Sequence, residues 1–75
     1  MSAPDTQRYT LRCRGRLDAD FLADYCPAGT TLTIGQESFT LANLHTDQAG
    51  VLGIIRSLHN LGCTLLALTI DTSDE

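Results

Sequence analysis

Residues 46–71 hold the feature that most constrains the fold, a helical repeat of apolar residues that is followed at once by a strand-like run. In the segment TDQAGVLGIIRSLHNLG, apolar residues recur every three or four positions and so occupy one half of a helix. Thr46 or Asp47 is a suitable N-cap, and Gly62 suits the left-handed residue that closes a helix. The next segment, TLLALTID, predicts a strand at 64–71. Because an apolar stripe this wide must be buried, we expect the helix to pack on a sheet that contains this strand.

The first half of the chain supplies the rest of the sheet. The segment RYTLRCRGRL, residues 8–17, alternates largely between apolar and basic residues and predicts a strand with one buried face. Residues 18–25 predict a short helix with Asp18 at its start, and residues 30–34 and 38–45 predict two strands joined by a short connection. The resulting order, strand-helix-strand-strand-helix-strand, is that of a ferredoxin-like α+β domain, with a four-stranded antiparallel sheet and both helices on one face.

The same patterns predict two details of the packing. Phe39, Leu41 and Leu44 cannot all face the core in a regular strand, so we expect a β-bulge near Ala42 or Asn43. We also expect six apolar residues to hold the fold together: Leu11, Phe39, Leu52, Ile55, Leu58 and Leu68.

The length of the chain limits how large its core can be. The 75 residues predict one domain at 8–71, with polar tails at 1–7 and 72–75. A domain this small buries only about 60% of its unfolded surface, so association with a second copy would add stability. The sequence has no apolar run long enough to cross a membrane, and its N-terminus lacks an apolar signal segment, which favours a cytoplasmic protein.

The start of the long helix resembles a known family. The segment DQAGVL, residues 47–52, is similar to the turn that opens the helix in the first βαβ unit of ACT domains, which are small regulatory modules that bind amino acids. The resemblance implies a ligand- or anion-binding regulatory domain. Asp47 and Gly50 are the ligand-binding candidates, because a helix N-terminus binds anions through its free N–H groups. Against this, Asp47 suits a cap, Gly50 suits close packing, and the motif lies in the second half of the chain.

The whole chain is more similar to a group of small bacterial proteins of unknown function. That resemblance rests on an Arg-rich first strand, RYTLRCRGRLD, and on a C-terminal helix of the pattern DQA-x-L. The helix pattern is matched here by Asp47, Gln48, Ala49 and, one place further on, Leu52. The resemblance implies no particular activity.

Four of the five basic residues lie in the first predicted strand, at positions that share one face: Arg8, Arg12, Arg14 and Arg16. Like-facing neighbours on a strand are about 6–7 Å apart, a spacing at which guanidinium groups can hold a phosphate, a carboxylate or a nucleic-acid backbone. RNA-binding sheets of this topology add aromatic residues for base stacking, and we expect none on this face. The net charge of −4 also argues against nucleic acid. We therefore expect the arginines to pair with acidic residues of neighbouring strands or of another copy.

The cysteine and histidine residues form no recognisable metal or catalytic motif. Cys13, Cys26 and Cys63 are odd in number and lack the paired spacing of zinc sites and disulfide frameworks, so we expect free thiols. His59 and Cys63 could lie close together, but a zinc site needs three or four ligands. No spacing places a base beside an activated nucleophile. We expect no enzymatic activity, no cofactor and no metal.

The sequence thus favours a non-enzymatic, homo-oligomeric structural or regulatory module, with a homodimer as the expected assembly. One candidate interface is a ridge of small residues on the long helix, formed by Ala49, Gly53 and Ser57. The other is the uncovered sheet face, where we expect Leu65 and Ala67 to lie beside the arginines. The alternative is the ACT-like ligand- or anion-binding domain. Nucleic-acid binding through the arginines is the least favoured hypothesis, and no membrane partner is expected.

Overall fold

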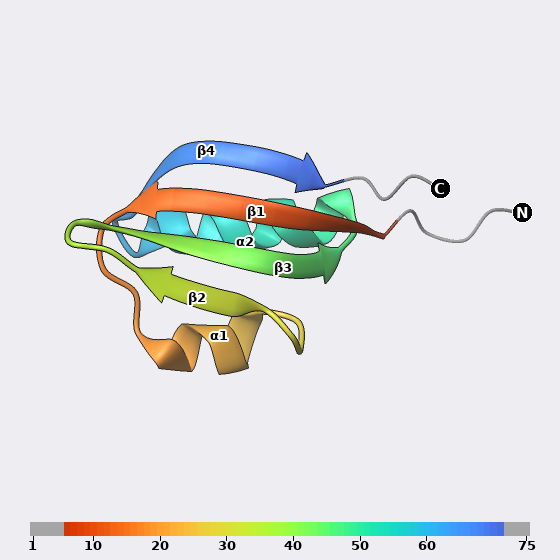
Figure 1. Ribbon diagram of the computed structural model, residues 1–75, viewed down its shortest axis with the longest axis horizontal. Helices are drawn as coiled ribbons and strands as arrows, with labels where there is room; N and C mark the ends of the chain where they lie inside the picture. The colour runs from red at the N-terminus through yellow and green to blue at the C-terminus, as the bar shows by residue number, and fades with distance from the viewer. Residues whose placement is uncertain (1–5, 72–75) are drawn as a thin grey trace, which may run out of the picture.

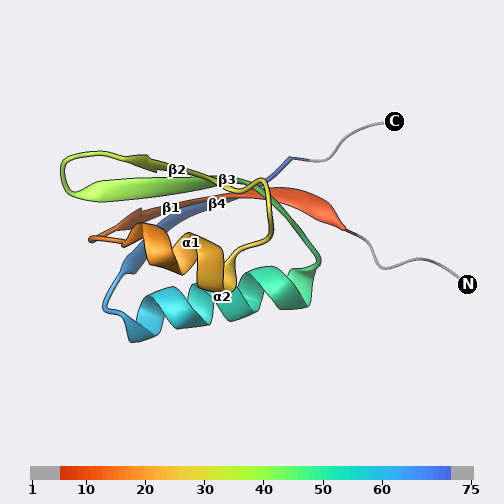
Figure 2. The ribbon, with the colours of Figure 1, turned by 90° about the horizontal axis from the view of Figure 1, so that it is seen from below.

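The computed structural model describes residues 6–71, which form one antiparallel sheet and two helices (Figure 1). In chain order the elements are β1 (Gln7–Arg14), α1 (Ala19–Tyr25), β2 (Thr31–Ile34), β3 (Ser38–Thr46), α2 (Gln48–Asn60) and β4 (Thr64–Asp71). The strands lie in the order β2-β3-β1-β4, and all three neighbouring pairs are antiparallel. Both helices cover the same face of the sheet, called the helix face below; the opposite one is the outer face (Figure 2). The predicted ferredoxin-like α+β fold is confirmed.

The predicted tails fall mostly outside the described residues. Residues 1–5 and 72–75 are not described, and Gln7, which was expected in the N-terminal tail, already belongs to β1.

Local interactions fix both ends of α2. Of the two candidate N-caps it is Asp47 that acts, because its Oδ1 accepts a hydrogen bond from the backbone N–H of Gly50 at 2.8 Å. Gly50 is required at this turn, since a Cβ there would collide with the side chain of Thr46. At the other end Gly62 has a φ of +89°, as predicted, and leads the chain into β4.

The short helix α1 starts at the predicted place. It begins one residue after Asp18, but the Asp18 side chain makes no capping hydrogen bond. The backbone carbonyl of Asp18 instead accepts a hydrogen bond from the N–H of Phe21 at 3.0 Å. Phe21 is buried and lies against Tyr25, with 4.7 Å between the ring centroids.

The predicted bulge is present in β3. Tyr9 pairs with Leu44 and Leu11 pairs with Leu41, so that one residue of β1 lies opposite two residues of β3, Ala42 and Asn43. Asn43 takes up the extra length with a φ of +59°, in the left-handed region that asparagine tolerates. As a result Leu41 and Leu44 both point into the core.

A second irregularity, in β4, was not predicted. Arg12 pairs with Ala67 while its neighbour Cys13 pairs with Leu65, so Leu66 is an extra residue. Cys13 is buried on the helix face, and the residue paired with it lies on the same face. The prediction that Leu65 shares the outer face with Ala67 is therefore wrong, because simple alternation cannot register an inserted residue.

The core lies between the helices and the central strands. It comprises Tyr9, Leu11, Cys13, Leu17, Phe21, Phe39, Leu41, Leu44, Val51, Ile54, Leu58 and Cys63. Of the six predicted core residues, three are buried, and Ile55 is half-buried against the core. The other two assignments are wrong for the single chain: Leu52 is 52% exposed and Leu68 is 43% exposed. α2 packs on the sheet through a narrow stripe at Val51, Ile54 and Leu58, which leaves its flank open.

Candidate functional site

The most unusual surface of the molecule is the edge formed by β4. This strand is the last of the sheet, and in the described part of the chain nothing pairs with its free side (Figure 1). All eight of its residues are exposed. A strand in this position presents a row of unpaired backbone N–H and C=O groups that another strand can join.

The side chains along this edge are apolar. Leu65, Leu66, Leu68 and Ile70 of β4 are between 40% and 50% exposed. On α2, Leu52 follows the same flank as Ile55, which lines a hollow together with residues of β4. We call Leu52, Leu65, Leu66, Leu68 and Ile70 the β4 surface. Large apolar side chains that are exposed together on one element often mark an interaction site, so the β4 surface is a candidate interface.

A small hollow lies beneath the β4 surface. It measures about 330 Å³ and is lined by Cys13, Ile55, Leu58, His59, Cys63, Thr64 and Leu65. Burial raises the pKa of the Cys13 thiol, and the neighbouring Cys63 raises it further. The Cys63 thiol donates a weak hydrogen bond to the carbonyl of Arg16 at 3.7 Å. A buried thiol with a raised pKa is a poor nucleophile, and Cys13 is such a thiol.

The structure brings His59 and Cys63 to the same hollow, as the spacing suggested. Within residues 6–71, however, no group of three or more histidine, cysteine, aspartate or glutamate side chains is arranged to hold a metal ion. Cys26 lies away from this hollow, at the end of α1, where burial raises its pKa as well.

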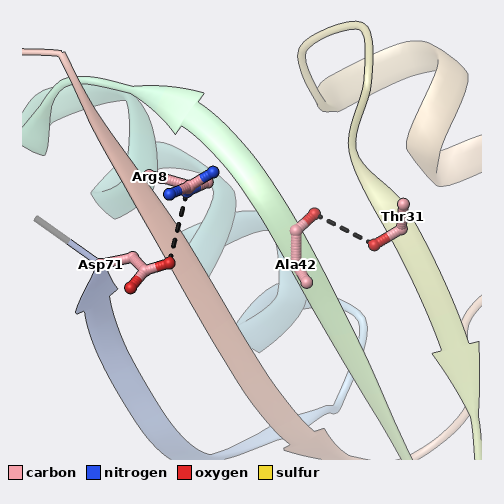
Figure 3. Close-up of polar contacts among 4 residues, drawn as sticks. All are labelled: Arg8, Thr31, Ala42 and Asp71. Atoms are coloured by element: carbon pink, nitrogen blue, oxygen red, sulfur yellow. Dashed lines mark hydrogen bonds and ion pairs between the residues drawn. The ribbon is translucent and has the colours of Figure 1, made fainter. Parts of the chain in front are cut away.

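The predicted arginine row is only partly formed. β1 ends at Arg14, Gly15 then takes a φ of +131°, and Arg16 turns away to line a second hollow beside α1. Arg8 pairs with Asp71 of β4, with 3.3 Å between Nε and Oδ2 (Figure 3). The Nε–H is not aligned for a hydrogen bond, so this contact is an ion pair alone.

Arg12 and Arg14 remain on the outer face. Both are exposed, and among the residues described neither lies within 4.0 Å of a carboxylate oxygen. Their cross-strand neighbours are small: Thr40 and Ala67 flank Arg12, and Ser38 and Thr64 flank Arg14. Towards the other edge, the Thr31 hydroxyl donates to the Ala42 carbonyl at 3.4 Å and ties β2 to β3 (Figure 3).

The second hollow lies between α1 and the β2–β3 connection. It measures about 750 Å³, and its walls include Arg16, Asp20 and Tyr25. Its floor is formed by the buried ring of Phe39 and by the β1–α1 connection. Among the described residues, the buried side-chain atom that lacks a hydrogen-bond partner is Arg8 Nε, and Arg8 does not line this hollow. None of the described polar side chains in the hollow is therefore both buried and without a partner.

Two candidate sites were expected on α2, a ligand site at its N-terminus and an interface along its ridge of small residues. The N–H of Gly50 is bonded to Asp47, so the proposed anion position at the helix N-terminus is filled by the chain's own carboxylate. The ridge of Ala49, Gly53 and Ser57 faces away from the core, and the Ser57 hydroxyl donates to the Gly53 carbonyl at 3.1 Å. A Cβ at Gly53 would have no neighbour within 4 Å, so nothing in the described chain requires glycine there.

Sequence reasoning missed the β4 surface because it placed Leu52 and Leu68 in the core. One signal was available. The segment TLLALTI carries apolar residues at both odd and even positions, which suits a strand covered on both sides, yet the fold places this strand at an edge.

In the part of the chain that the structure describes, neither helix is long and apolar enough to span a membrane. Comparison with curated proteins and with solved structures gives no match for the chain. A family model does match, and it covers residues 8–69, which include all but the ends of β1 and β4. The chain therefore belongs to the family described as "Domain of unknown function (DUF8691)".

Proposed function

We propose that this protein is a non-enzymatic association module that forms a homodimer through the free edge of β4. The observation that carries the proposal is the β4 surface. β4 is a long edge strand whose residues are all exposed, and its large side chains are leucines and an isoleucine. Joining a second strand to this edge would satisfy its backbone N–H and C=O groups and cover its leucines together.

A second copy of the same strand is the best-matched partner. Two β4 strands can pair antiparallel about a two-fold axis, so that two four-stranded sheets become one sheet of eight strands with all helices on one face. No charged residue lies between Thr64 and Ile70, so the pairing meets no repulsion along its centre.

The charges at the ends of β4 do not repel each other in this arrangement. Antiparallel pairing brings the Thr64 end of one strand next to the Asp71 end of the other. Arg14 pairs with Thr64 within its own chain and is free of a carboxylate partner among residues 6–71. The two Asp71 carboxylates then lie at opposite ends of the strand pair, and each keeps Arg8 of its own chain as its partner.

The wrong core assignments support the same arrangement. Leu52 and Leu68 sit where the sequence pattern demands burial, and both are half-exposed in the single chain. A dimer through β4 would bury them and would enlarge a core that is marginal in a domain of this size. We also propose a cytoplasmic location, because the free thiols at Cys13, Cys26 and Cys63 suit a reducing compartment.

Sedimentation of the full chain across the micromolar range tests this function. We expect a species of twice the 8.1 kDa chain mass that dissociates on dilution. Leu68→Lys places a charge on the free edge and should shift the protein to the monomer with at least about a tenfold weaker association. Thr33→Lys, on the opposite edge strand β2, is the matched control and should leave the dimer intact. A wild-type monomer throughout the range would overturn the proposal.

A further inference from the structure

The net charge of −4 conceals an uneven distribution of charge. In the described part of the chain one acidic residue lies on the outer face, Asp71, and it is already paired with Arg8. The other described acidic residues lie in or beside the helices or in the β2–β3 connection: Asp18, Asp20, Asp24, Glu37 and Asp47. Counted over residues 6–71, the outer face is therefore locally positive, and the overall charge does not exclude an anionic partner there.

We propose that the outer face of the sheet binds the phosphodiester backbone of nucleic acid without reading its base sequence. Arg12 and Arg14 supply the charge. They lie two residues apart on one strand, so their Cα atoms are about 7 Å apart and their side chains leave the sheet on the same side. Guanidinium groups form paired hydrogen bonds with phosphate oxygens. The hydroxyl groups of Ser38, Thr40 and Thr64, beside them in register, can donate to the same oxygens.

The composition of this face distinguishes the backbone from other ligands. None of the four phenylalanine and tyrosine residues is on it, because three are buried and Tyr25 is on α1, so base stacking is not available. The hollows described above do not include Arg12 or Arg14, so a small molecule would not be enclosed.

A protein partner fits this face less well than nucleic acid. Protein interfaces depend on a few large apolar or aromatic anchors, and the apolar residues that the described cross-strand pairs place on the outer face are the small Ala42 and Ala67. Interfaces with nucleic acid are instead polar and positively charged, which describes a surface of arginine, threonine and serine.

The proposed dimer would strengthen binding at this weak site, and the binding strength expected below rests on that dimer. Among the described residues, the outer face of one chain offers two arginines without an acidic partner, which predicts weak binding. Pairing through β4 places two such faces side by side on one continuous sheet, so four arginines would meet the same strand. With four neutralised phosphates the logarithmic salt slope for a single strand is about −2.8, and a fourfold rise in salt should weaken binding about fiftyfold.

Fluorescence anisotropy with a labelled oligo-dT strand at low salt tests the proposal. We expect salt-dependent binding with the slope given above. The double variant Arg12→Gln, Arg14→Gln should weaken binding at least about tenfold and abolish most of the slope. Arg56→Gln is the control: it removes one positive charge, half of what the double variant removes, from an exposed position on α2 and should change the affinity by less than about twofold. A duplex of equal length shows which form of the backbone is preferred.

Three results would overturn the inference: no binding by the wild type at low salt, equal binding by the double variant, or equally effective displacement of the oligonucleotide by polyglutamate. The neutral variant Leu68→Asn separates this inference from the proposed dimer. If both hold, the resulting monomer should bind with about half the slope. A wild-type monomer that still binds through Arg12 and Arg14 would refute the dimer and leave the backbone-binding face standing.

Discussion

The two edges of the sheet are built differently. β2 is four residues long, its Thr31 hydroxyl is bonded to the neighbouring strand, and α1 lies alongside it (Figure 2). β4 is twice as long, carries leucines and an isoleucine, and has no charge before its last residue. Short length, polar side chains and a covering helix are the usual means of preventing an edge from pairing. β2 is short and half of its residues are threonine, although its Ile34 is also exposed, whereas β4 is long and mainly apolar.

This difference is the basis of the proposed pairing through β4. An exposed apolar edge strand is a site of aggregation unless something specific occupies it. The same strand suits a two-fold interface, because its centre is uncharged and antiparallel pairing keeps the two Asp71 residues apart. The polar outer face runs uninterrupted to this edge, so a second copy would extend it. The comparison of the edges therefore links the proposed dimer to the proposed nucleic-acid surface.

The largest effect is expected at the core that the two edges share. Leu58→Ala should lower the free energy of unfolding by about 2–5 kcal/mol, because Leu58 is buried beneath the central strands. Leu52→Ala removes the same atoms one and a half turns away, on the β4 side. Its cost should be small in the dilute monomer and should grow with protein concentration as the dimer forms. Chemical denaturation at two concentrations measures both, and equal, concentration-independent costs would contradict the assignment of Leu52 to an interface.

A dimer through β4 also makes the stability of the wild type depend on concentration. Each tenfold increase in protein should stabilise the folded dimer by about 1.4 kcal/mol and raise the melting temperature by a few degrees. Leu68→Lys should abolish this dependence, while Thr33→Lys on β2 should retain it. Calorimetry over two decades of concentration is the measurement, and a constant melting temperature for the wild type would argue for a monomer.

The thiols provide a probe on each side of the molecule. Burial raises the pKa of Cys13 and of Cys26 above their ordinary value of 9.0. The unfolded chain therefore loses these protons first, and the stability that the buried thiols confer is present below about pH 9 and is lost as the pH rises through the raised pKa. We expect the free energy of unfolding to fall above that pH, followed by denaturation at a series of pH values. Unchanged stability across that range would contradict the burial of the two thiols.

Alkylation distinguishes the two sides directly. Cys26 is half-buried at the end of α1 and should react at a rate that does not depend on protein concentration. Cys13 and Cys63 line the hollow beneath β4 and should react at least about tenfold more slowly in the folded than in the unfolded chain, with further protection in the dimer. Mass spectrometry of alkylated peptides gives the rates. Dimer-dependent protection of Cys26 alone would place the interface on the wrong edge.

The smallest effect is expected on the outward side of α2. Gly53→Ala should raise the free energy of unfolding by about 0.5–1 kcal/mol, because Gly53 lies inside a helix and an added Cβ meets nothing within 4 Å. It should leave the association constant unchanged, since the proposed interface is β4 rather than the small-residue ridge. Gly50→Ala is the contrasting variant and should destabilise, because its Cβ collides with Thr46. Weaker association of Gly53→Ala would favour the ridge instead.

The sequence predicted the fold well because the signals for it are local. The apolar period of α2, the Asp47 cap and Gly62 fix one helix and its following strand, and the mismatch of Leu41 and Leu44 fixed the bulge in β3. The bulge at Leu66 was not predicted from the sequence. Its neighbours on both sides are apolar, so an inserted residue leaves no break in the apolar pattern of the strand. The exposure of the β4 surface was not predicted for a related reason. An apolar residue is expected to be buried, but the sequence does not say whether its own chain or a second copy covers it.

The charge of the outer face could not be predicted from the net charge of the chain. The net charge was the main argument against an anionic partner, and it sums over residues that the fold places on opposite sides of the sheet. The alternation of β1 identified Arg12 and Arg14 correctly, but it also included Arg16, which Gly15 turns out of the strand. Charge distribution depends on topology, so it could be assessed only once the layers were known.

Amide hydrogen exchange, read residue by residue by NMR, is the most direct test of the central claim. In the single chain the backbone N–H groups of β4 that do not bond to β1 point outward, as do the free N–H groups of β2. Pairing between two β4 strands predicts that the outward β4 amides exchange slowly at high protein concentration and lose this protection on dilution, while those of β2 exchange fast at both. If the outward amides of β4 exchange as fast as those of β2 at every concentration, the edge is unpaired in solution and the account is wrong.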